Sequence, residues 1–126
     1  MRTLTRLALV ALVIVAVLTP GTGLAAGALD AVYSVTEQSP VPPILTQYFT
    51  VVIQTGSTVG IANLFYDDGT WTYGFGTLVG NRVTGTLYDP DGSPYGTFNV
   101  TISGNTFSGQ SVFGGYTRTI TGIKIF

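Results

Sequence analysis

Short turns at regular intervals are the feature that most constrains the fold of this chain. They separate stretches of about eight to ten residues that are rich in Thr, Val, Ile, Tyr and Phe, the composition of β-strands. Five of the seven connections have two residues and contain glycine: Gly56-Ser57, Asp68-Gly69, Gly80-Asn81, Gly104-Asn105 and Gly114-Gly115. Because such loops are the strongest short-range signal for a β-hairpin, we expect successive strands to pair as antiparallel neighbours.

Eight strands are expected after residue 28, where no window shows a helical period with caps. Their ranges are 31–38, 47–55, 58–67, 70–79, 82–89, 95–103, 106–113 and 116–125. Gly56, Gly80 and Gly104 are spaced 24 residues apart, the length of one hairpin with its return turn, which favours an up-and-down meander. Eight antiparallel strands close as a small barrel, and closure removes the exposed sheet edges. The sequence therefore predicts an all-β barrel, with an open sheet or small β-sandwich as the alternative.

The first 28 residues have the pattern of a secretory signal peptide. Arg2 and Arg6 precede twelve apolar residues, Leu7–Leu18, and small residues follow as far as Ala28. Twelve residues are fewer than the ~20 that cross a bilayer as a helix. We expect an N-terminal signal helix in residues 1–28, cleaved after Ala26 or Ala28, and a single β domain over 29–126. The protein is then periplasmic or extracellular and meets the membrane only through this segment; a retained membrane anchor is the alternative.

Charge and composition exclude several classes of function. Three basic residues, Arg82, Arg118 and Lys124, stand against six acidic ones after residue 28, a net charge of −3, which argues against nucleic-acid binding. The chain contains no His and no Cys, which excludes Ser-His-Asp and Cys-His catalysis, zinc sites with N or S ligands, and thiol redox chemistry. A pair of carboxylates suffices for glycoside hydrolysis, but the candidate acids lie at turns. We therefore expect neither an enzyme nor a cofactor.

The two-residue turns also predict which side chains share a face. Across Gly104-Asn105, Ile102 is expected opposite Phe107, with the polar Thr101 and Ser108 on the other face, a pattern of apolar inside and polar outside. Across Asp68-Gly69, Tyr66 is expected opposite Trp71, and across Gly80-Asn81, Tyr73 is expected opposite Tyr88. One face of the third to fifth strands then gathers an aromatic cluster of Tyr66, Trp71, Tyr73, Phe75 and Tyr88.

These five aromatic residues are the candidate ligand-binding residues of the sequence. Both faces of their strands are apolar, so periodicity alone does not decide which face is inside. Three interpretations stay open: a packed core, the lining of a cavity for a small apolar ligand, or an outer binding surface.

Alternate connections of a meander lie at alternate ends. This places both long loops, Ser39–Thr46 and Pro90–Pro94, and four of the six acids at one end. This end is the expected mouth of any cavity. Its aspartates are weak candidates for calcium ligands: Asp67, Asp68, Asp89 and Asp91. Turn chemistry is the preferred explanation for them, because a calcium loop supplies more oxygen ligands in one run, and we expect no metal site.

Residues 48–98 resemble a widespread, largely uncharacterised group of secreted bacterial β domains. The resemblance rests on Phe65-Tyr66-Asp67-Asp68-Gly69-Thr70-Trp71-Thr72-Tyr73 and on Gly85-Thr86-Leu87-Tyr88 with Gly96. The group has a Tyr-Asp-x-x-Gly-x-x-Trp-Tyr stretch followed by a Ser/Thr-Gly-x-Leu-Tyr strand. This chain lacks the group's usual Trp-Tyr-Asn-Pro opening, and its Asp-Gly turn is one residue shorter. The resemblance implies an envelope or secreted β domain and no activity.

The sequence thus predicts an exported, non-catalytic β-barrel domain, a structural or binding module of the bacterial envelope or secretome. Its partner is then a small hydrophobic molecule or an envelope protein. One alternative is a lipocalin-like carrier of a small hydrophobic ligand. The other is a small outer-membrane β-barrel, against which the last strand places Arg118 and Lys124 on the face of Phe126. A cation facing lipid costs ~2–4 kcal/mol at the bilayer midplane.

Overall fold

A computed structural model of the chain describes residue 27 and residues 29–126. The predicted signal helix and both predicted cleavage sites involve residues outside this described part. The described part contains no helix long and apolar enough to cross a membrane.

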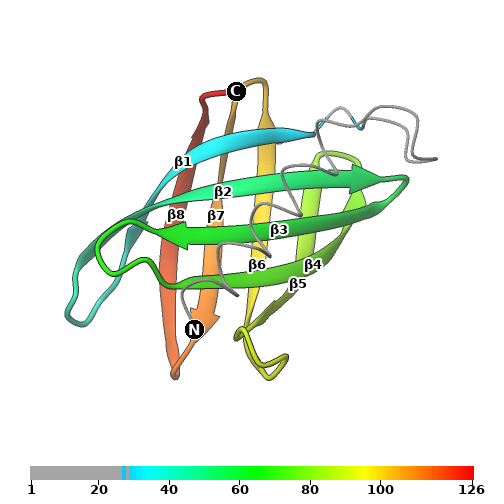
Figure 1. Cartoon of the computed structure of the whole chain (residues 1–126). Coiled ribbons are helices and arrows are strands. Elements are labelled where there is room, and N and C mark those ends of the chain that lie inside the picture. The colour runs from blue at the N-terminus through cyan, green and yellow to red at the C-terminus, as the bar shows by residue number, and fades with distance from the viewer. Residues whose placement is uncertain (1–26, 28) are drawn as a thin grey trace.

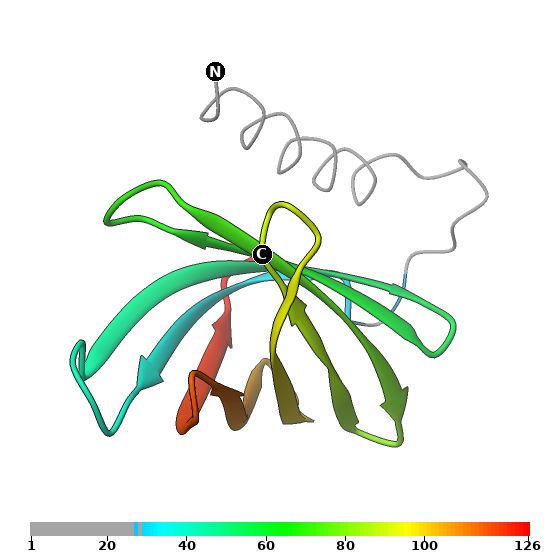
Figure 2. The ribbon, with the colours of Figure 1, turned by 90° about the horizontal axis from the view of Figure 1, so that it is seen from below.

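The described residues form eight antiparallel β-strands that close into a barrel in chain order. The strands are β1 (Ala31–Gln38), β2 (Leu45–Thr55), β3 (Thr58–Phe65), β4 (Trp71–Val79), β5 (Arg82–Tyr88), β6 (Pro94–Ser103), β7 (Thr106–Phe113) and β8 (Tyr116–Lys124). Strands β1 to β3 run across the view of Figure 1, whereas β6 to β8 run up it behind them. Seen from below, the strands arch around a shared interior (Figure 2). The predicted closed meander is confirmed, and the open sheet and the sandwich are not formed.

Two of the three predicted hairpin registers are confirmed. Ile102 lies opposite Phe107 across the Gly104-Asn105 turn, and Tyr73 lies opposite Tyr88 across Gly80-Asn81. Gly80 and Gly104 have φ of 64° and 58°, the left-handed conformation that glycine adopts without steric cost. Their local geometry therefore fixes the pairing of the flanking strands.

The register predicted across Asp68-Gly69 is wrong by two residues. Leu64, and not Tyr66, lies opposite Trp71, because residues 66–70 form a longer turn. Gly69 N donates to the Phe65 carbonyl at 3.0 Å, and Phe65 N donates to the Thr70 carbonyl at 2.9 Å. A shift of two residues preserves the alternation of a strand, so every side chain here stays on its predicted side of the sheet.

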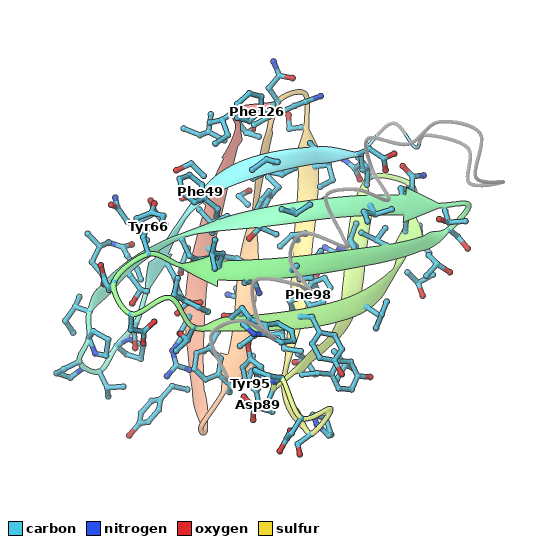
Figure 3. The ribbon with its side chains drawn as sticks, viewed as in Figure 1. Phe49, Tyr66, Asp89, Tyr95, Phe98 and Phe126 are labelled. Carbon is cyan, nitrogen blue, oxygen red and sulfur yellow. The ribbon has the colours of Figure 1, made fainter. Side chains whose placement is uncertain are left out.

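The barrel interior holds the hydrophobic core. Its buried members come from seven strands and are Ala31, Tyr33, Val35, Tyr48, Val52, Val59, Val83, Leu87, Phe98, Val100, Phe107 and Ile120. Figure 3 shows Phe98 between the strands of the two crossing directions. The strands also present glycines to the interior, and an added Cβ at Gly85 would lie 2.5 Å from the Cα of Gly76. Glycine at this position lets β4 and β5 curve closely around the interior.

We expect Gly85→Ala to lower the free energy of unfolding by about 1–3 kcal/mol, the usual cost of overpacking. The new methyl group would meet backbone atoms of Phe75 and Gly76, which cannot move aside alone. Urea denaturation followed by circular dichroism measures the change.

Gly60→Ala is the matched control, because its added Cβ would lie on the outer face of β3, 3.6 Å from the Phe75 ring. This is an ordinary van der Waals distance, so the control is expected to be neutral or stabilising by up to ~1 kcal/mol. Equal losses of stability in the two variants would contradict the assigned inner and outer faces.

Candidate ligand cavity

The barrel interior contains a cavity of about 420 Å³ that is lined by residues from all eight strands. This volume falls within the ~300–1,000 Å³ of small-molecule sites in proteins. The cavity has an apolar half toward the tight turns and a polar half toward the long loops.

The apolar half has a mainly buried lining near the tight-turn end. Its lining is mainly aliphatic and includes Leu29, Val52, Val59, Ile61, Val83, Val100, Ile102 and Phe107, with the Tyr33 ring 5.1 Å from that of Phe107. Leu29 precedes β1 and packs against the core. Its backbone N donates to Gln54 Oε1 at 3.1 Å, while the carboxylate of Asp30 accepts from Gln54 N at 2.7 Å. These bonds tie the start of β1 to the end of β2.

The polar half contains a buried carboxylate, Glu37, on β1. Only 9 % of Glu37 is exposed, and it lines the cavity. Tyr48 OH and Ser111 Oγ donate to its Oε1 at 3.5 and 3.4 Å. Burial raises the pKa of the Glu37 carboxyl, and the Arg118 charge and these two hydrogen bonds offset part of that rise. Burial and the nearby Glu37 charge in turn raise the pKa of the Tyr48 hydroxyl well above its usual value.

A chain of hydrogen bonds continues the polar half around the barrel from β2 to β6. Thr50 Oγ1 donates to Asn63 Oδ1 at 2.7 Å, and Asn63 Nδ2 donates to Thr72 Oγ1 at 3.2 Å. Tyr95 OH also donates to Thr72 Oγ1 at 3.2 Å. The pairing of β5 with β6 shifts at Leu87/Tyr88, which leaves Tyr95 unpaired in a bulge. Bulges redirect side chains in this way, and here Tyr95 joins the cavity lining.

Arg118 lies at the open end of the cavity and is held by its neighbours on β7 and β8. Its Nη1 donates to the Phe113 carbonyl at 2.6 Å and to the Tyr116 carbonyl at 3.3 Å. The guanidinium lies 3.4 Å from the centre of the Phe113 ring, a cation–π contact. These contacts fix the guanidinium at the rim.

The cavity opens at the long-loop end. There its lining includes the exposed residues Pro43 and Asp89, whereas its lining at the other end is mainly buried. Figure 3 shows Asp89 and Tyr95 close together at this end of the barrel. This is the end at which the loop pattern of the sequence placed a mouth.

The five aromatic candidates of the sequence do not line the cavity. Tyr66, Trp71, Tyr73, Phe75 and Tyr88 lie on the outer face, because the alternating positions Thr72, Gly74 and Gly76 of β4 face inward. Tyr73 stacks with Trp71 and Tyr88 at centroid distances of 5.9 and 5.3 Å. Tyr66 is apart from these rings and packs on Phe49 at 4.8 Å (Figure 3). The interpretation of these rings as cavity lining is wrong, and their use as an outer binding surface stays a prediction.

The four aspartates considered for calcium make turn contacts or lie apart. Asp68 Oδ1 accepts from the backbone N and the hydroxyl of Thr70 at 2.9 and 2.6 Å. Asp91 Oδ1 accepts from Ser93 N at 2.9 Å, and hydrogen bonds from Ser93 lower the pKa of the Asp91 carboxyl. Asp67 is exposed in the same turn as Asp68, and Asp89 lies at the cavity mouth. No three acidic, His or Cys side chains gather as a metal site in the described part.

Four polar residues of the cavity were missed as a site by the sequence analysis: Glu37, Tyr48, Tyr95 and Arg118. The assumption that the acids lie at turns is wrong for Glu37, which lies within β1. A signal for it exists in the sequence, since Tyr33, Val35 and Glu37 alternate and therefore share one face. An acid in line with apolar residues indicates a buried carboxylate. The bulge that turns Tyr95 inward leaves no such signal.

Comparisons with known proteins do not assign the chain to a family. No protein-family model matches it, and a search of curated proteins finds no match. The resemblance of residues 48–98 to secreted bacterial β domains therefore stays a prediction.

We expect the stability of the protein to depend on pH through Glu37. The raised pKa means that the folded state holds this proton more tightly than the unfolded chain does. The contribution is complete below the ordinary pKa of 4.5 and is lost as the pH rises through the folded-state pKa. The free energy of unfolding of the wild type should therefore fall relative to that of Glu37→Gln as the pH rises. Urea denaturation from about pH 4 to pH 8 measures this difference, and parallel profiles would contradict it.

Proposed function

We propose that the protein is an exported carrier that holds a small, largely apolar molecule inside its barrel. The observation that supports this proposal is the cavity of about 420 Å³ with an apolar, mainly buried half and a polar half whose lining includes exposed residues. Protein interiors are normally close-packed, with few voids larger than a water molecule. A cavity of this size forfeits packing energy, so a ligand is the simplest reason for its presence.

The inward glycines of β4 and β5 support a carrier over a purely structural module. Gly74, Gly76 and Gly85 face the interior, where a structural barrel would be filled by larger side chains. The bulky Trp71, Tyr73 and Phe75 of β4 lie outside instead. These three rings therefore take up no interior volume, although neighbouring atoms pack closely at the glycines themselves.

The outer face of β6 to β8 argues against the outer-membrane alternative. Its exposed positions carry mainly polar side chains, among them Thr97, Asn99, Ser108, Gln110, Thr119 and Thr121. A transmembrane barrel needs an apolar outer band on every strand. The sequence argument against this alternative assumed that Arg118 would face lipid. That assumption is wrong, because Arg118 lines the cavity.

We expect the neutral fluorophore N-phenyl-1-naphthylamine to bind with one molecule per barrel and to gain emission. Val100→Phe fills the apolar half, where Val100 is 7 % exposed, and should weaken binding by about tenfold or more. Thr97→Phe is the matched control, because it adds the same ring to the exposed face of the same strand. Circular dichroism confirms that both variants are folded. Equal affinities in the three proteins, or no binding to the wild type, would contradict a ligand site in the barrel.

Export gives a separate prediction about the mature N-terminus. Gly27 N lies 2.9 Å from Asp30 Oδ2, so cleavage after Ala26 would give a charged terminal amine paired with this carboxylate. We therefore expect mass spectrometry of the exported protein to show a chain that starts at Gly27. A chain starting at Leu29 would contradict this choice of site, and an uncleaved chain would support the retained anchor.

A further inference from the structure

We propose that the carried molecule has a positively charged amine, which Glu37 binds within the polar half of the cavity. This inference rests on the proposed carrier function. The apolar body of the ligand then lies in the apolar half, against Val59, Val83 and Val100.

Glu37 has an oxygen that the protein leaves open for such a partner. The hydrogen bonds of Glu37 in the described structure both reach Oε1, and at 3.5 and 3.4 Å they are long. Oε2 accepts no hydrogen bond there, although only 9 % of the residue is exposed. A carboxylate in such a site is stabilised by donors, and Oε2, which is not among the fully buried atoms without a partner, can accept from a group in the cavity.

Arg118 does not supply that donor. Its Nη1 is bonded to the carbonyls of Phe113 and Tyr116, and its guanidinium stacks on the Phe113 ring. It acts on Glu37 through charge attraction without a hydrogen bond. The space beside Oε2 is therefore left to a ligand.

The charges of the cavity favour a cationic ligand over an anionic one. Glu37 and Asp89 both line the polar half, against the single cation Arg118. Asp67 and Asp91 add negative charge in the loops of the same end, and a cleft with one dominant sign of charge concentrates ions of the opposite sign. A carboxylate ligand would face repulsion from Glu37 and Asp89.

Aromatic rings around Glu37 add a second attraction for an ammonium group. Tyr48 and Tyr95 line the cavity on the same polar half, and the Tyr48 hydroxyl contacts Glu37 directly. The faces of such rings attract cations, most strongly where water is excluded. A primary amine thus finds a carboxylate oxygen with two tyrosines in the same half of the cavity, whereas an alcohol gains only the weaker neutral hydrogen bond.

The test compares three ligands with the same ten-carbon chain: decylamine, 1-decanol and decanoate. Each displaces N-phenyl-1-naphthylamine from the wild type and from Glu37→Gln near neutral pH. We expect the amine to bind the wild type most tightly and to lose about tenfold in affinity in the variant, as for a hydrogen bond to a charged group. The alcohol is the internal control and should change by less than roughly threefold.

Dependence on pH tests the same pairing without a variant. The affinity ratio of amine to alcohol should fall as the pH is lowered and Glu37 gains its proton. Four other groups face Glu37 or the same end: Tyr48, Tyr95, Arg118 and Asp89. Burial raises the pKa of both tyrosines, so they stay neutral in this range. The profile should persist in Asp89→Asn, which separates Glu37 from the acid at the mouth.

The outcomes separate this inference from the carrier function. Tighter binding of decanoate than of decylamine, or an amine affinity unaffected by Glu37→Gln and by pH, would overturn the amine assignment while fluorophore binding upholds the carrier. Failure of the fluorophore and of all three ligands to bind would overturn the carrier function itself.

Discussion

The pairing of β1 with β8 is the interaction on which the rest of the structure depends. It joins the first and last strands from Tyr33↔Lys124 to Gln38↔Thr119 and turns a meander into a closed barrel. Closure gives each strand one face toward an enclosed space. It also brings Glu37 opposite Ile120, within hydrogen-bond reach of Ser111, which is 74 residues away in the chain. In an open sheet, Glu37 would lie on an edge strand in contact with water.

The distribution of side-chain size between the two faces determines that the barrel contains a cavity. On β4, the bulky Trp71, Tyr73 and Phe75 lie outside, while Thr72, Gly74 and Gly76 lie inside. Glycines on the inner face allow close approach and tight curvature, and the rings outside take up no interior volume. The same choice places a largely apolar surface on the outside of β2 to β4, in contrast to the polar exterior of β6 to β8.

The polar half of the cavity is best understood as a cost that ligand binding offsets. Hydrogen bonds link Thr50, Asn63, Thr72 and Tyr95, so these groups are largely satisfied within the barrel. Glu37 is the exception, because burial raises its pKa and one of its oxygens stays open to the cavity. An arrangement that destabilises the empty protein and points at a cavity is typical of binding sites.

The sequence by itself determined the number of strands, their antiparallel order and two of the hairpin registers. These follow from local geometry, since a two-residue turn with glycine at φ near 60°, as at Gly80 and Gly104, fixes how its own strands pair. Only the tertiary structure decided which face of β3 to β5 is inside, because both faces are apolar and the choice depends on packing against distant strands. The longer turn at residues 66–70 and the site around Glu37 were likewise decided there. Glu37 meets Tyr48, Ser111 and Arg118 only after closure, through contacts that no local pattern encodes.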